Sequence, residues 1–142
     1  MNISNTGIMD KKEIERKIGE AISRFEDVDI AYVFGSFLDS EKFNDIDVAI
    51  VLNRELNAYN RFKFAMGIAR ELEKEIKPRF EFDVKILNYS PVDFQHEVLK
   101  KGIVIFKRDE NRRIEYEANL ITTYLDIKYM YEFLDKKFLA RI

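Results

Sequence analysis

A glycine, a serine and three aspartates supply the residue types from which a phosphate-handling site is built. Gly35 and Ser36 follow an apolar run, where glycine lets the backbone turn sharply and bring N–H groups and a hydroxyl close to an anion. Asp45 and Asp47 begin the next apolar run two residues apart, so in a strand their carboxylates project from one face. Asp83 lies in a later segment that alternates apolar and charged residues.

The ligand chemistry of these carboxylates favours a hard, oxygen-preferring cation such as Mg²⁺. The chain has no Cys and a single His, which excludes a thiolate metal site and a cysteine nucleophile. A charge between Phe82 and Val84 is costly unless it is paired or bound to a metal, so we expect a cation at Asp83. Three carboxylates on neighbouring strands can hold two Mg²⁺ ions about 3.5–4 Å apart, the arrangement used in nucleotidyl transfer.

Composition limits the classes of partner. Among 142 residues, 24 Lys and Arg face 26 Asp and Glu, giving a net charge of −2. The chain lacks the basic excess of proteins that coat nucleic acid, so no direct nucleic-acid binding is expected. Its longest apolar runs have five residues, far below the roughly 20 that span a bilayer, so no membrane contact is expected either. We expect a cytoplasmic protein with a flexible tail at residues 1–8 and one domain over 9–142.

Hydrophobic periodicity indicates the elements that must position the candidate residues. It predicts helices from residue 10, over 58–77, from 91 to 101 and from 109 to about 138, and strands over 29–34, 46–52, 80–87 and 103–106. Only nine residues separate the first two strands, too few for a crossover helix, so an antiparallel or locally looped pair is expected. The fold class is therefore α+β, a two-layer α/β arrangement with a mixed sheet flanked by helices and a long C-terminal helix.

Several local patterns give more detailed expectations. In the helix at 58–77, an apolar stripe is predicted to face the core; it comprises Phe62, Ala65, Met66, Ala69, Leu72 and Ile76. The Ser90-Pro91 pair has the preferences of a helix start, and His96 is expected at a solvated helix position.

The last helix carries two apolar stripes, one more than a single internal face requires. The first has spacings of 4, 3, 4, 3 and 4 and comprises Leu120, Tyr124, Ile127, Tyr131, Leu134 and Phe138. The second comprises Ile114, Ala118, Ile121 and Leu125. One stripe is expected to dock on the sheet, and the other is open to a partner protein or a second copy.

The order of strand, Gly-Ser, short loop, Asp-x-Asp strand, helix and Asp-bearing strand resembles the DNA polymerase β-like nucleotidyltransferase superfamily. It is most similar to the minimal nucleotidyltransferases of the MntA type, which it also matches at Val92-Asp93-Phe94, Gly102-Ile103, Arg108-Asp109 and Tyr124-Leu125-Asp126. The resemblance implies a polymerase β-like fold with ATP as donor. It also implies roles for five residues: Gly35 and Ser36 bind the nucleotide, and Asp45, Asp47 and Asp83 are catalytic and bind two Mg²⁺ ions.

The same resemblance implies a partner, a HEPN-domain toxin of the HepT type encoded nearby, which is silenced by transfer of AMP to a tyrosine. The chain departs from the family pattern in having eight residues, not ten, between Ser36 and Asp45, and Asp39-Ser40 in place of Arg-Gly. Two alternatives stay open. One is a weak or inactive antitoxin that occludes its toxin through the last helix, and the other is an adenylyltransferase for a small molecule, which normally needs an added acceptor domain.

Overall fold

The computed structural model describes residues 10–41, 43–77 and 80–140, so the expected tail at 1–8 lies outside the described residues. The elements in chain order are α1 (Lys11–Ser23), β1 (Val28–Phe34), α2 (Ser36–Asp39), β2 (Asp45–Leu52), α3 (Ala58–Glu75), β3 (Glu81–Ile86), the 3₁₀ turn η2 (Leu87–Tyr89), α4 (Val92–Lys101), β4 (Ile103–Lys107) and α5 (Glu110–Ala140). Within these ranges, no helix is both long and apolar enough to span a membrane.

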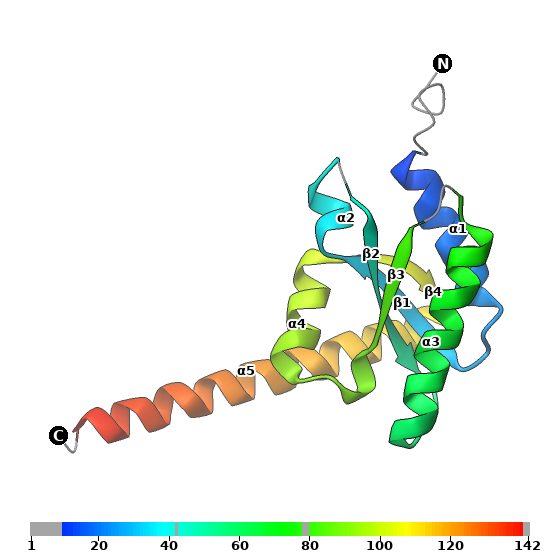
Figure 1. Ribbon diagram of the computed structural model, residues 1–142. Helices are drawn as coiled ribbons and strands as arrows, with labels where there is room; N and C mark the ends of the chain where they lie inside the picture. Colours follow the sequence, from blue (N-terminus) through cyan, green and yellow to red (C-terminus); the bar gives the residue numbers. More distant parts are fainter. Residues whose placement is uncertain (1–9, 42, 78–79, 141–142) are drawn as a thin grey trace.

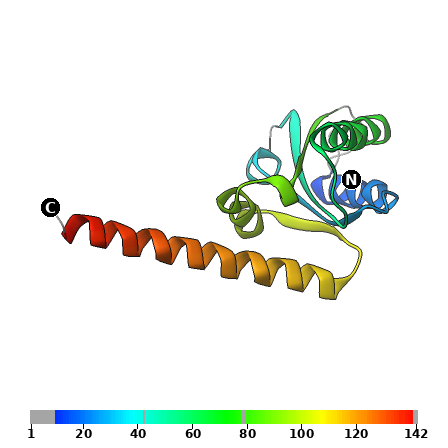
Figure 2. The same cartoon turned by 90° about the horizontal axis from the view of Figure 1, so that it is seen from below.

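The four strands form one mixed sheet in the order β3-β2-β1-β4. Strand β1 pairs antiparallel with both β2 and β4, and β2 pairs parallel with β3. Helices α1 and α3 lie on one face of the sheet, and α4 with the first half of α5 lies on the other (Figures 1 and 2). The predicted mixed sheet flanked by helices, the antiparallel first pair and the long C-terminal helix are thereby confirmed.

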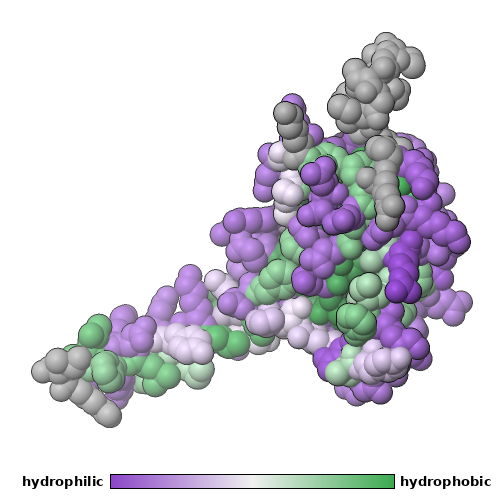
Figure 3. Space-filling model, in the orientation of Figure 1, coloured by the Kyte–Doolittle hydropathy of each residue, from purple (hydrophilic) through white to green (hydrophobic). Residues whose placement is uncertain are grey.

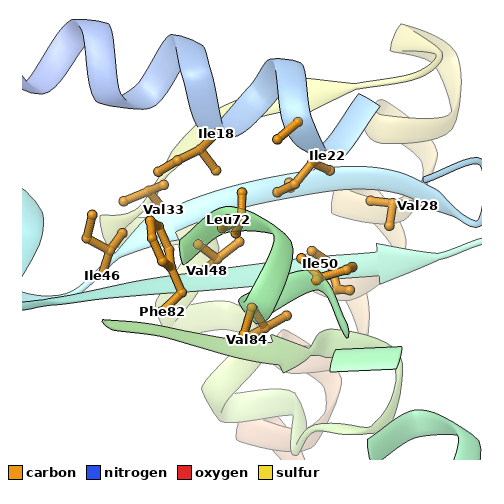
Figure 4. Close-up of a cluster of buried hydrophobic side chains, with 14 of the residues drawn as sticks. Ile18, Ile22, Val28, Val33, Ile46, Val48, Ile50, Leu72, Phe82 and Val84 are labelled. Carbon is orange, nitrogen blue, oxygen red and sulfur yellow. The ribbon is translucent and has the colours of Figure 1, made fainter. Parts of the chain in front are cut away.

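The main core lies between the sheet and the pair α1 and α3. Ile18 and Ile22 of α1 meet Val33 and Val48 of the two central strands, with Leu72 of α3 closing the cluster (Figure 4). All five side chains are fully buried. Burying an aliphatic side chain of this kind contributes roughly 1.5–3 kcal/mol, so this cluster holds the central strands rigidly in register.

The predicted buried face of α3 is confirmed at its C-terminal end, where Ala69, Leu72 and Ile76 are buried, and is wrong at its N-terminal end. Ile68 and Leu72 are buried, whereas Phe62 and Met66 are exposed. Phe62 and Met66 precede Phe64 and Ile68 by two residues, a separation that puts them about 200° away around a helix. Two apolar stripes therefore run along α3, and periodicity alone does not say which of them meets the sheet.

The start of α4 also differs from the predicted cap. The Ser90 hydroxyl donates to the Ile86 carbonyl at 2.9 Å, so it closes the η2 turn and does not cap the helix. Pro91 is the residue that precedes the first turn of α4, and its side chain makes no cap bond. The short η2 turn was not predicted, because three residues give too little periodicity.

The first half of α5 is held against the sheet by a second, smaller apolar cluster with polar bonds at its margin. The buried Tyr32 hydroxyl donates to Glu117 at 2.6 Å, and Glu117 also accepts from Arg113 at 2.9 Å. The Tyr116 hydroxyl donates to Gln95 of α4 at 2.7 Å. These bonds connect β1 and α4 to α5 and fix the direction in which the long helix leaves the domain.

We expect the fold to lose stability in alkali through Tyr32. Burial, followed by the hydrogen bond to Glu117, raises the pKa of Tyr32 above its usual value of 10.0. An unfolded chain releases this proton near pH 10 while the folded chain retains it, so the contribution is complete below pH 10 and falls as the pH rises further. Thermal unfolding followed by circular dichroism between pH 8 and 11 should show a smaller decline of Tm for Tyr32→Phe than for wild type. Equal declines in the two proteins would contradict the prediction.

At neutral pH the same variant is expected to lose about 1 kcal/mol, the usual net value of one hydrogen bond. Because Arg113 still pairs with Glu117, the loss should stay near that value.

Candidate active site

The first part of the site is the beginning of β2, where acidic and apolar side chains alternate. Asp45 is exposed and Asp47 is half-buried, whereas Ile46 and Val48 between and after them are fully buried. The prediction that the two carboxylates share one face of the strand is confirmed. The hydrophobic face of the same strand holds that orientation, because turning the strand over would expose Ile46 and Val48 to water.

The parallel pairing of β2 with β3 brings the third acid to the same place. Asp47 is directly opposite Asp83, and Asp45 is opposite Glu81. Burial raises the pKa of Asp47, and the charges of Asp83 and Asp45 raise it further, while Lys85 opposes them. The ionised form of Asp47 is therefore destabilised in the folded protein, and a bound cation would stabilise that form.

The backbone at position 35 has a conformation and a close neighbour that only glycine accommodates. Its φ of 81° belongs to the region that side-chain-bearing residues rarely adopt, and a Cβ at this position would lie 2.4 Å from Asp47 Oδ2. The contact follows from the antiparallel register, in which Phe34 is opposite Asp47. Gly35 and Asp47, twelve residues apart in sequence, are thus in direct contact.

The loop from 36 to 44 contains the short helix α2, which was not predicted because four residues give no periodic pattern. Phe37 is fully buried and packs edge-on against Phe43 with ring centroids 4.7 Å apart. Lys11 of α1 lies over both rings and donates to the Ser40 carbonyl at 2.6 Å. This packing holds Phe37 and Phe43 near α1, and Ser36 and Asp39 remain exposed.

The surroundings of Asp83 correct one expectation. Its side chain is 52% exposed and forms an ion pair with Lys85 at 3.5 Å, so it carries little desolvation cost. Alternation correctly placed Asp83 on the face opposite Phe82 and Val84, but that face is open to solvent at this end of the sheet. Lys85 was missed, although its position two residues after Asp83 places it on the same face by the same alternation.

A second base, Lys101, lies on the α4 side of the site. The hydrogen bond to Glu97 and the charge of Glu97 raise the pKa of Lys101, and Asp39 adds to the effect. At the same end of α4, Gly102 lies beside Phe34, the residue before the Gly-Ser turn. The site therefore has acids along the sheet and basic side chains on both flanks.

The donor chemistry of the site fits a hard cation, since the groups that converge on Asp47 are carboxylates and the chain has no Cys. Over the described ranges, no three Asp, Glu, His or Cys side chains are already close enough together to form a metal centre. Asp83 is paired with Lys85 in this arrangement. The acids thus present carboxylate oxygens along two adjacent strands of the sheet.

The only histidine takes part in a helix contact and is not solvated as expected. The His96 ring stacks on Tyr124 of α5 with centroids 3.6 Å apart and planes within 1° of parallel. His96 is half-buried between α4 and α5. It lies on a different element from the aspartates and serves to join the two helices.

Residues 16–111 match the family model described as "Polymerase beta, Nucleotidyltransferase", which covers more than half of the chain. No curated protein matches the sequence.

Several solved structures share the fold. One is a chain of the tri-AMPylated Shewanella oneidensis HEPN toxin in complex with MNT antitoxin, 17% identical, with a TM-score of 0.65 over 92% of this chain and 99% of that chain. A second is from the toxin–antitoxin pair MntA–HepT, 16% identical, with a TM-score of 0.64 over 90% and 98% of the two chains. A third is from a toxin–antitoxin with AMP-PNP, 17% identical, with a TM-score of 0.66 over 88% and 98%.

At such identities the likeness establishes the fold, and it extends over nearly the full length of the compared chains. The expected polymerase β-like architecture is thereby confirmed. The family model covers both the Gly-Ser turn and all three aspartates. With its Gly-Ser turn packed on an Asp-x-Asp strand and a third aspartate across the sheet, the chain belongs to the polymerase β nucleotidyltransferase family.

Proposed function

We propose that this nucleotidyltransferase transfers AMP from ATP to a tyrosine of a HEPN-domain toxin encoded nearby, and so acts as an antitoxin in the cytoplasm. The observation that carries the proposal is the contact of Gly35 with Asp47, across the sheet from Asp83. A glycine turn of the kind that can bind phosphate, close to a carboxylate that lies opposite another, supports nucleotidyl transfer. The similar folds in complexes of MNT and MntA antitoxins with toxins support the choice of partner. Residues 9–142 would act as one domain.

In this proposal the backbone of Gly35 and the hydroxyl of Ser36 hold the β- and γ-phosphates of ATP. Asp45 and Asp47 would hold two Mg²⁺ ions, and Asp83 would complete the second site. Bound Mg²⁺ would supply positive charge that stabilises the attacking and leaving oxygens. Lys85, released from Asp83, stays within reach of the same face and adds to the positive charge around the phosphates.

The proton of the acceptor hydroxyl must be removed during the transfer, because a free tyrosine has a pKa near 10 and is protonated at neutral pH. The Asp83 carboxylate is exposed and so within reach of an acceptor, and it is the group proposed to take this proton. The tyrosine oxygen then bonds to the α-phosphorus of ATP. The bond from that phosphorus to the bridging oxygen breaks, and pyrophosphate leaves.

The test is transfer of label from α-labelled ATP to the purified HEPN-domain protein of the neighbouring gene, in the presence of Mg²⁺. We expect label on that protein with wild type and none with Asp45→Asn/Asp47→Asn. A variant of an exposed acid away from the site and from α5, Glu26→Gln, should transfer label at the wild-type rate. Replacing tyrosines of the toxin with phenylalanine identifies the acceptor.

An occluding antitoxin without catalysis is the second candidate, favoured by the exposed Asp39 beside the Gly-Ser turn. An acid at this place repels a triphosphate. Toxin inhibition that survives Asp45→Asn/Asp47→Asn, with no label transferred by wild type, would select this candidate and reject adenylylation.

A further inference from the structure

The long helix α5 divides into a packed half and an exposed half. Leu120 is buried, and Tyr124 and Ile127 are the last side chains that the domain partly covers. All twelve residues from 128 to 139 are exposed, and we call this segment the α5 arm. At 1.5 Å per residue the arm is about 18 Å long, and it points away from the body of the molecule (Figures 1 and 2).

The arm is unusually apolar for an exposed helix. Seven of its twelve residues are apolar or aromatic, and Figure 3 shows hydrophobic patches along its length. One stripe continues the packed face at spacings of four, three and four through Tyr131, Leu134 and Phe138. Tyr129 and Phe133 lie on a different side of the helix. Exposed apolar surface on more than one side of a helix indicates that other protein covers it in the assembled state.

A pocket of about 520 Å³ lies at the root of the arm, where it leaves α4. Val92 of α4 and Ile127 with Tyr131 of α5 give it an apolar floor. Three acids and one lysine also line it; these are Asp93, Glu132, Asp135 and Lys128. The pocket therefore combines an apolar surface with a net negative charge, and its apolar side runs into the stripe of the arm.

We propose that the α5 arm and the pocket at its root bind a helix of the partner protein, one that carries an apolar stripe with Lys or Arg beside it. This rests on the proposed function, which supplies a protein partner. Apolar residues at alternating spacings of four and three are typical of helices that pack along each other, so the stripe favours a helix as its binding partner. The basic residues of that helix would face the acids of the pocket, where charge complementarity favours them.

A second copy of the chain fits this surface less well. A second copy would bring the same arm, in which Lys128, Lys136 and Lys137 nearly balance Glu132 and Asp135, so it offers the three acids of the pocket little net positive charge. A partner helix that carries Lys or Arg beside its apolar stripe would be attracted to the acids of the pocket.

The experiment measures the affinity of the full chain for the purified HEPN-domain partner by titration calorimetry without ATP. Leu134→Glu places a charge in the middle of the stripe and should weaken binding at least about thirtyfold, as loss of a central contact does. Glu132→Lys/Asp135→Lys should weaken it at least about tenfold. Both variants should keep the wild-type Tm, because the arm makes no core contact in the domain.

Matched controls place the same changes elsewhere. Phe62 is also an exposed apolar residue, on α3, so Phe62→Glu should leave the affinity within about twofold of wild type. Glu26→Lys/Glu55→Lys makes the same change in net charge at exposed positions far from the arm and should behave likewise. Asp45→Asn/Asp47→Asn should also bind with wild-type affinity.

The outcomes separate the arm from the catalytic site. Wild-type affinity in both arm variants, or no binding by wild type at all, would overturn the arm as the docking surface, whatever label transfer shows. Arm-dependent binding without label transfer would support the docking surface and reject adenylylation. A wild-type dimer that Leu134→Glu converts to a monomer, with partner affinity unchanged, would assign the arm to a second copy and overturn the proposal.

Discussion

Replacing Asp47 with asparagine is expected to reduce AMP transfer by at least about a hundredfold while leaving the protein as stable as wild type or more so. Asp47 contacts Gly35 and lies opposite Asp83 of β3. Its carboxylate therefore lies between the Gly-Ser turn and the third aspartate. Asparagine keeps the shape of the side chain but removes the carboxylate that a hard cation needs. Loss of a few kcal/mol of charge stabilisation in the transition state corresponds to this factor.

The gain in stability follows from the environment of the carboxylate. Burial and the neighbouring acids raise the pKa of Asp47, which means that the folded chain holds this group's charge at a cost. At pH 7 the unfolded chain ionises it freely, so a neutral side chain removes a penalty that only the folded state has. For Asp47→Asn, the rate of AMP transfer measured with labelled ATP should therefore fall, while Tm stays the same or rises. A variant that keeps more than a tenth of the wild-type rate, or that unfolds more easily, would contradict this reading of Asp47.

Gly35→Ala is expected to damage both the fold and the activity. The added Cβ would lie 2.4 Å from Asp47 Oδ2, and the φ of 81° is itself unfavourable for alanine. The backbone conformation alone costs about 1–3 kcal/mol, and the clash forces either the turn or the aspartate to move. Transfer of label should therefore fall together with Tm, which distinguishes this variant from Asp47→Asn.

Gly67→Ala is the matched control. Gly67 lies in the middle of α3, and a Cβ there meets no atom within 4 Å. Alanine should stabilise the helix by roughly 0.5–1 kcal/mol and leave transfer unchanged. If the two glycine variants shift Tm equally and both keep activity, the contact between Gly35 and Asp47 does not constrain the site.

The placement of the acids could be predicted from sequence because it depends on a period of two within a single strand. Because side chains alternate between the two faces of a strand, Asp45 and Asp47 must share one face of β2. The apolar Ile46 between them indicates that the opposite face is the buried one. The same rule gives the face of Asp83 but not its exposure, since exposure depends on whether another element covers that end of the sheet. The Asp83 side chain is 52% exposed, so the described residues leave this end of the sheet open.

Features that depend on contacts between distant segments could not be predicted. The approach of Gly35 to Asp47 results from a register between two strands that share no sequence signal. On α3, the choice between the stripe of Phe62 and that of Phe64 depends on which way the helix is rotated over β3. The stack of His96 on Tyr124 depends on the crossing of α4 with α5.

The contact between the Gly-Ser turn and the second aspartate also couples the evolution of two positions. While an acid occupies position 47, selection can accept only glycine at position 35, because any side chain there displaces the carboxylate. Once the acid is lost, the backbone at position 35 can relax and larger residues become acceptable. Among relatives with this register, a residue other than glycine after the first strand would therefore mark a pseudoenzyme, even where the remaining aspartates persist.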